Sequence, residues 1–137
     1  MANRDDHDAL GALFGGLSVL VSAAAAGRDP TLGEFLGGIA GGVLGSRIPD
    51  VLEPAVHPNH RKVAHSFAAA ALTGRFVVPA AHRLHAGGAT QAEAELDPAL
   101  KFLQQFAAGA SVGTVAGYGS HLVADASTPK GLPLLGF

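Results

Sequence analysis

The sequence predicts an all-α fold, a compact bundle of about four helices followed by an irregular C-terminal tail. Prolines and glycines divide the 137 residues into four long stretches in which strand patterns are almost absent. Glycines recur at every fourth position in two of these stretches, and alanine and glycine together form about a third of the chain. A chain of this length accommodates one domain, so we expect residues 1–137 to form a single helical unit.

The first helix is expected from about residue 8 to residue 26. Residues 9–26 form an uncharged run of 18 residues, the length at which a membrane-spanning helix becomes a candidate. Asp5 and Asp6 precede this run and suit the positive end of a helix dipole. Because no basic region leads the run, a cleaved signal peptide is not expected.

The second helix is expected to begin with a capping box from Thr31 to Glu34 and to stop before Pro49. Its glycines form two rows, Gly33, Gly37, Gly41 and Gly45, and then Gly38 and Gly42. Four-residue spacing puts each row on one helix face, where another backbone can approach closely. Each glycine costs about 1 kcal/mol relative to alanine in a helix, so close packing must compensate.

Two further helices follow a proline-rich polar segment, residues 47–62. The third is expected from about Val63 to the glycine pair at residues 87–88, with a kink at Pro79. The fourth takes Asp97 as its N-cap and runs from residue 98 to about residue 126. It carries a third glycine row, Gly109, Gly113 and Gly117.

Composition excludes several function classes. The chain has no cysteine, so disulfides, thiolate metal sites and a cysteine nucleophile are ruled out. Nine basic residues against 11 acidic ones give a net charge of -2, which does not favour nucleic-acid binding. Charged residues are only 15% of the chain, a composition that suits a membrane protein or a buried assembly. We expect a membrane-associated bundle with two spans, residues 9–26 and 102–120, and a soluble homo-oligomer remains the alternative.

Polar residues from three segments are expected to meet at one end of this bundle. In an up-down-up-down arrangement, the end of the second helix, the start of the third and the end of the fourth lie together. His121 and Asp125 are four residues apart and share one helix face, as a pair of metal ligands does. An ion pair or a helix cap is the alternative for these two. The candidate metal ligands are Asp50, His60, His65, His121 and Asp125.

Imidazole and carboxylate ligands without a thiolate suit zinc, manganese, iron or nickel, and we expect a divalent ion with zinc as the first choice. Such an ion can activate water to attack an ester near neutral pH. Glu53 and His57 lie close by in the sequence and are candidates for moving protons. His82 and His85 are expected roughly 30 Å away along the third helix and are not candidates for this site.

Three motif blocks carry a resemblance to a known family. The first block is Gly45-Ser46-Arg47-Ile48-Pro49-Asp50, and the second is His60-Arg61 with His65-Ser66. The third is the run from residue 120 to residue 135, whose pattern consists of His121, Leu122, Asp125, Thr128, Gly131, Leu134 and Leu135. Over about residues 33–137 the chain resembles the bacterial membrane-bound metal-dependent hydrolases of the LexA-regulated inner-membrane (YdjM-like) type. That family is distantly similar to zinc-dependent phospholipase C and single-strand nucleases.

The resemblance implies a helical inner-membrane hydrolase with the same five metal ligands and a phosphoester or lipid-like substrate. Membrane lipid and a second copy of the chain are the expected partners. Leu52 stands where the family commonly has a second acid, and this favours a competing hypothesis. In that hypothesis the chain is a non-catalytic membrane or assembly protein that self-associates through its small-residue helix faces.

Overall fold

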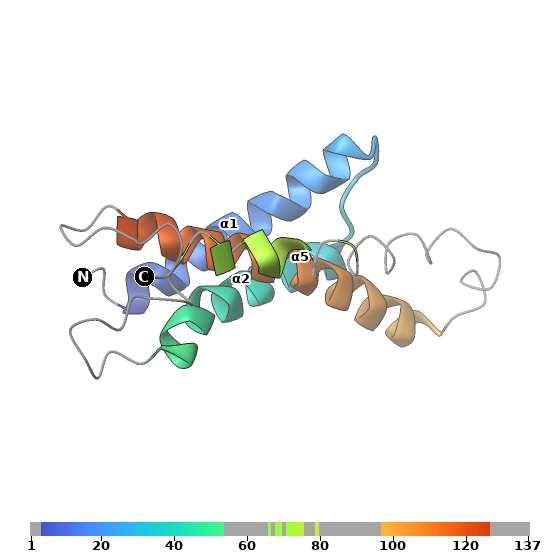
Figure 1. The fold of residues 1–137 in the computed structure, drawn as a ribbon. Helices are drawn as coiled ribbons and strands as arrows, with labels where there is room; N and C mark the ends of the chain where they lie inside the picture. Colours follow the sequence, from blue (N-terminus) through green and yellow to red (C-terminus); the bar gives the residue numbers. More distant parts are fainter. Residues whose placement is uncertain are drawn as a thin grey trace.

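A computed structural model describes residues 4–53, 66, 68–69, 71–75, 79 and 97–126. These residues form three long helices, α1 (Arg4–Ala25), α2 (Leu32–Leu52) and α5 (Pro98–Ala126). No strand occurs in the described part of the chain, so the all-α prediction is confirmed. Figure 1 shows the start of α1, the end of α2 and the end of α5 at the same end of the bundle. Most of the expected third helix and the C-terminal tail lie outside the described residues.

Helix α1 begins at Arg4, four residues earlier than expected, and has Asp5 and Asp6 in its first turn. It ends with Gly27 in the left-handed conformation at φ 66°, which glycine adopts without a steric penalty. The Gly27 N–H donates to the Ala24 carbonyl at 3.0 Å, and the Arg28 N–H donates to the Ala23 carbonyl at 3.1 Å. These two bonds form a Schellman cap, which satisfies carbonyls that the helix end would otherwise leave without partners.

Helix α2 begins with the predicted capping box. The Glu34 N–H donates to Thr31 Oγ1 at 3.2 Å, and the Thr31 N–H donates to Glu34 Oε2 at 2.8 Å. Arg28 also donates to both carboxylate oxygens of Glu34, at 2.8 and 2.9 Å, and Glu34 is buried. The cap therefore joins the loop after α1 to the first turn of α2.

Thr31→Ala is expected to lower the free energy of unfolding by about 1 kcal/mol, because the Glu34 N–H loses its acceptor. Thr31→Ser keeps the hydroxyl and is expected to stay within a few tenths of the wild type. Chemical denaturation in detergent measures both values. Equal losses in the two variants would contradict this account of the cap.

The expectation that the second helix stops before Pro49 was wrong, because α2 continues through Pro49 to Leu52. Proline lacks an N–H, so the helix loses one bond, the one to the carbonyl four residues earlier. The last turn is held on its other side, where the Glu53 N–H donates to the Pro49 carbonyl at 2.9 Å. Asp50 therefore lies in the last turn of α2 rather than in a loop.

Glycines lie where α2 contacts α5. A Cβ added at Gly37, Gly41 or Gly45 would collide with backbone carbonyls of α5, those of Phe106, Ala110 and Thr114. In the other direction, a Cβ on Gly109, Gly113 or Gly117 would collide with the carbonyls of Glu34, Gly38 and Gly42 on α2. The missing side chains let the two backbones touch over about three turns.

Helix α1 approaches α2 in the same way. A Cβ added at Gly15 would collide with the Gly38 carbonyl, and one added at Gly42 would collide with the Gly11 carbonyl. The missing side chains of the second glycine row of α2 thus make room for α1, and those of its first row make room for α5. The carbonyls of the second row also contact α5. Helix α2 is the central element of the three, with a backbone contact on each of two faces.

Besides Val19, Tyr118 and Leu122, the described residues bury mainly small and polar side chains, and they expose many large apolar ones. Buried polar side chains include Glu34, Ser46, Ser120, His121 and Asp125. Exposed large apolar side chains follow the outside of the helices, among them Leu13, Phe14, Leu17, Leu20, Val21, Leu36, Leu44, Leu100, Leu103 and Val123. This distribution suits a surface that faces lipid rather than water.

One helix among the described residues is long and apolar enough to cross a membrane, at Asp5–Ala25. Residues 102–120, the second expected span, do not meet this test of length and hydropathy. That segment of α5 contains two strongly polar residues, Gln104 and Gln105, and four glycines, and these residues lower its mean hydropathy.

Candidate metal centre

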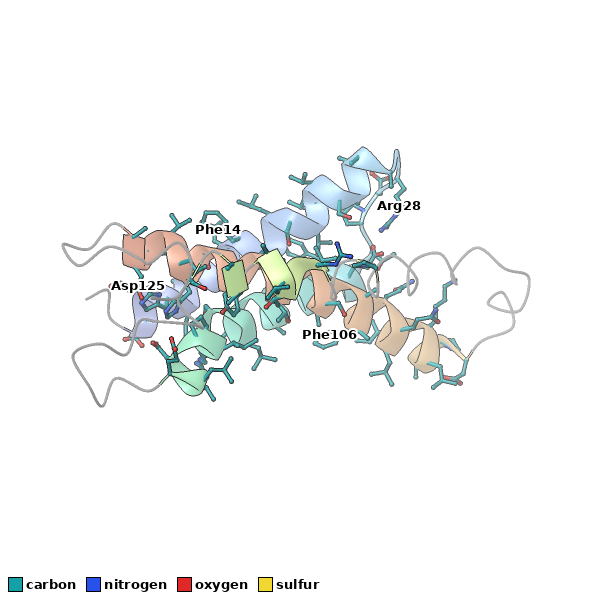
Figure 2. The ribbon with its side chains drawn as sticks, in the orientation of Figure 1. Phe14, Arg28, Phe106 and Asp125 are labelled. Atoms are coloured by element: carbon teal, nitrogen blue, oxygen red, sulfur yellow. The ribbon has the colours of Figure 1, made fainter. Side chains whose placement is uncertain are left out.

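Four ionisable side chains come together at the end of the bundle that the three helices share. His7 comes from the first turns of α1 and Asp50 from the last turn of α2. His121 and Asp125 come from the end of α5, one turn apart. Figure 2 shows Asp125 among nitrogen-bearing side chains at this end, with Arg28 at the opposite end of α1.

The side chains of this group lie close together. His121 Nε2 is 3.5 Å from Asp125 Oδ2 and 3.7 Å from Asp50 Oδ1. His7 Nε2 is 4.0 Å from Asp125 Oδ1. The imidazole rings of His7 and His121 stack with centroids 4.0 Å apart and planes 19° from parallel. One ligand atom from each of His7, His121 and Asp125 lies within 4.8 Å of the others.

Burial gives the cluster a closed side and an open side. His7, His121 and Asp125 are 6%, 1% and 3% exposed. The Asp50 side chain is 55% exposed. Asp50 is therefore the member of the group that solvent reaches, while the other three side chains are shielded from it.

The cluster passes two tests for a cation site. Its nitrogen-to-oxygen separations of 3.5–4.0 Å exceed those of hydrogen bonds, and they approach the separation of two ligands bound about 2 Å from one ion. The other ring nitrogen of His7, Nδ1, is not the one that lies 4.0 Å from Asp125, and it is buried with no hydrogen-bond partner among the described residues. A buried nitrogen of this kind is costly unless something binds it. The donor set of imidazoles and carboxylates suits zinc.

An ion pair lies beside the cluster and joins α1 to α2. Arg47 Nε donates to Asp8 Oδ1 at 2.8 Å, and Arg47 Nη2 donates to Asp8 Oδ2. These hydrogen bonds and the Asp8 charge raise the pKa of the Arg47 guanidinium. Asp8 directly follows His7, and Arg47 precedes Asp50 by three residues, so the pair connects the two helix turns that supply these ligands.

The structure describes four of the seven residues that the sequence singled out. Asp50, His121 and Asp125 lie together, as the bundle topology predicted. Glu53 lies at the C-cap of α2, next to this group in the chain. His57, His60 and His65 lie outside the described residues, as do His82 and His85, so their roles stay predictions.

Sequence reasoning missed His7. In a bundle of alternating helices the start of the first helix lies at the same end as the end of the second. That rule would have selected His7, but the first helix was expected to start at Asp8, and this excluded it. Asp5 and Asp6 were expected just before the helix start, at the positive end of its dipole, whereas they lie inside its first turn.

Comparison with known proteins gives one match. The sequence model of the YdjM inner membrane protein family matches residues 3–136, nearly the whole chain. No curated protein and no solved structure matches the chain.

Proposed function

The chain belongs to the YdjM inner membrane protein family, and on that basis we propose that it is a metal-dependent hydrolase of phosphoesters, with lipid-like substrates as the first class to test. The observation that carries this proposal is the convergence of His7, His121 and Asp125, from two helices, within 4.8 Å. The resemblance of the motif blocks to metal-dependent hydrolases, and more distantly to zinc-dependent phospholipase C, supports the reaction class.

The proposed ion is held by the buried groups His7, His121 and Asp125, with Asp50 at the open side. We propose that His60 and His65, which lie in the sequence near the expected start of the third helix, complete the ligand set. When bound, a divalent ion such as zinc supplies Lewis acidity, which makes a water molecule nucleophilic near neutral pH.

The chain's own groups then orient the reactants and move protons. The exposed carboxylate of Asp50 faces the side from which substrate arrives. Glu53 follows it at the end of α2 and is the proposed acceptor of the proton that the attacking water gives up. His57, four residues further along the chain, is proposed to deliver a proton to the leaving oxygen.

The position of the cluster along α1 supports a lipid-like substrate. The candidate span is Asp5–Ala25, and His7 lies in its first turn, which puts the cluster near one membrane surface. Val51 and Leu52, beside Asp50, are 72% and 65% exposed. A phosphoester headgroup with an attached apolar chain fits a polar cluster beside an apolar rim.

The test uses the full chain in detergent with two probes, phosphatidylcholine in mixed micelles and bis(p-nitrophenyl) phosphate. Hydrolysis of at least one is expected to stop with a chelator and to return with zinc. Glu53→Gln is expected to lower kcat about 100-fold while the bound metal remains, because Glu53 moves a proton and does not hold the ion. Asp97→Asn, at the far end of α5, is the control and should leave the rate unchanged. A protein that binds zinc but hydrolyses neither probe would contradict the hydrolase proposal.

The competing proposal is a non-catalytic protein that self-associates. The leucine row on α1, Leu13, Leu17 and Leu20, is exposed and would supply a surface for a second copy. The glycine faces in the described residues contact other helices of the same chain, so they are not available for this purpose. A metal-free, well-ordered oligomer would favour this proposal over the hydrolase.

A further inference from the structure

We propose that Asp8 and Arg47 are positioning residues that hold His7 against His121. The Arg47 guanidinium donates to both carboxylate oxygens of Asp8 and so fixes the first turns of α1 on the end of α2. Asp8 is the residue after His7, and the His7 ring stacks on the His121 ring at 4.0 Å. The pair therefore acts on the ligand through the backbone of one helix turn.

The packing next to the pair explains why positioning is needed. Near the cluster, α1 meets α2 through glycines, with Gly11 against Gly42 and Gly15 against Gly38. A glycine contributes no side chain of its own to set rotation or sliding, so at these contacts only a few neighbours do so, such as Val19 against Gly38 and Ser46 against Gly11. A shift of one residue along a helix turns a side chain by about 100°, enough to carry His7 away from the cluster. A bidentate arginine–carboxylate pair sets both distance and orientation.

Because the pair is partly exposed, breaking it should change the position of His7 more than the free energy of unfolding. The Arg47 and Asp8 side chains are 44% and 22% exposed, and exposed ion pairs contribute little to folding. The second arginine–carboxylate pair, Arg28 with Glu34, is also bidentate, through Nη1 and Nη2, and lies at the other end of α1. Arg28→Gln is therefore a matched control, because it breaks a similar pair far from the cluster.

The first readout needs no metal. In metal-free full-length protein in detergent, nuclear Overhauser effects between the ring protons of His7 and His121 report their stacking. We expect this signal in the wild type and in Arg28→Gln, and its loss in Arg47→Gln and in Asp8→Asn. The exchanged variant, Asp8→Arg with Arg47→Asp, should restore it. A signal that persists in both single variants would overturn the proposal.

The second readout is zinc affinity and rests on the proposed metal centre. Arg47→Gln is expected to weaken zinc binding about 10-fold, as the loss of an outer partner of a metal ligand does. The same substitution in a His7→Ala background should cause no further loss, because the ligand that it positions is gone. An equal loss in that background, or in Arg28→Gln, would overturn the proposal. A wild type that shows the ring signal but binds no zinc would refute the metal centre and still support the positioning role.

Discussion

Gly117→Ala is expected to lower the free energy of unfolding by about 3 kcal/mol. A Cβ at this position would collide with the Gly42 carbonyl oxygen and would lie 2.7 Å from its carbon and 2.8 Å from its Cα. These are backbone atoms of a neighbouring helix, so they cannot move aside as a flexible side chain can. Overpacking of this kind typically costs 1–3 kcal/mol, and the value should lie at the upper end because α2 must separate from α5.

The matched control lies two residues further along the same helix. A Cβ at Gly119 meets nothing within 4 Å. Gly119→Ala is therefore expected to raise the free energy of unfolding by about 0.5–1 kcal/mol, because alanine restricts the unfolded chain and favours the helix. Denaturation of both variants in the same detergent measures the difference. If both substitutions stabilise the protein, the backbone contact between α2 and α5 is not as close as described.

His121→Ala is expected to abolish stoichiometric metal binding and hydrolysis together. His121 is 1% exposed, its ring stacks on that of His7, and its Nε2 lies near the carboxylates of both Asp50 and Asp125. Removal of a metal ligand should weaken zinc binding more than removal of a residue that only positions a ligand, so we expect zinc affinity to fall more than about 100-fold. Asp125→Ala should behave in the same way, because its two oxygens face His7 and His121.

Metal content of purified variants, measured by elemental analysis beside zinc titration, checks this result. Ser120→Ala is the control, because Ser120 is buried next to His121 but its hydroxyl donates to the Gly117 carbonyl within its own helix. If both His121→Ala and Asp125→Ala still bind stoichiometric zinc, the ion lies elsewhere and the proposed function is refuted.

Local signals in the sequence predicted the fold wherever neighbouring residues decide the structure. The Thr31–Glu34 capping box forms as expected, and the Ala99 N–H donates to Asp97 at 2.8 Å at the predicted N-cap of α5. The glycine spacing identified the faces that the helices use. Pro49 was expected to end the second helix, because a proline inside a helix loses a hydrogen bond and clashes with the preceding turn. The packing of Gly45 against Thr114 and the burial of Pro49 keep the last turn of α2 helical.

The candidate site was predicted in part because it depends on topology. The rule of alternating helices brought Asp50, His121 and Asp125 together from residues far apart in the chain. His7 was not predicted because the start of the first helix was expected four residues too late. The prediction of a site at helix ends therefore depends strongly on where each helix is expected to begin and end. The Asp8–Arg47 pair joins positions 39 residues apart, and no local pattern indicates it.

The most direct test of the metal centre is anomalous diffraction at the zinc edge from crystals of the full chain grown with zinc. We expect one strong peak about 2.0–2.2 Å from ligand atoms of His7, His121 and Asp125. A peak located only at other histidines, or no peak at this cluster in zinc-saturated crystals, would contradict it.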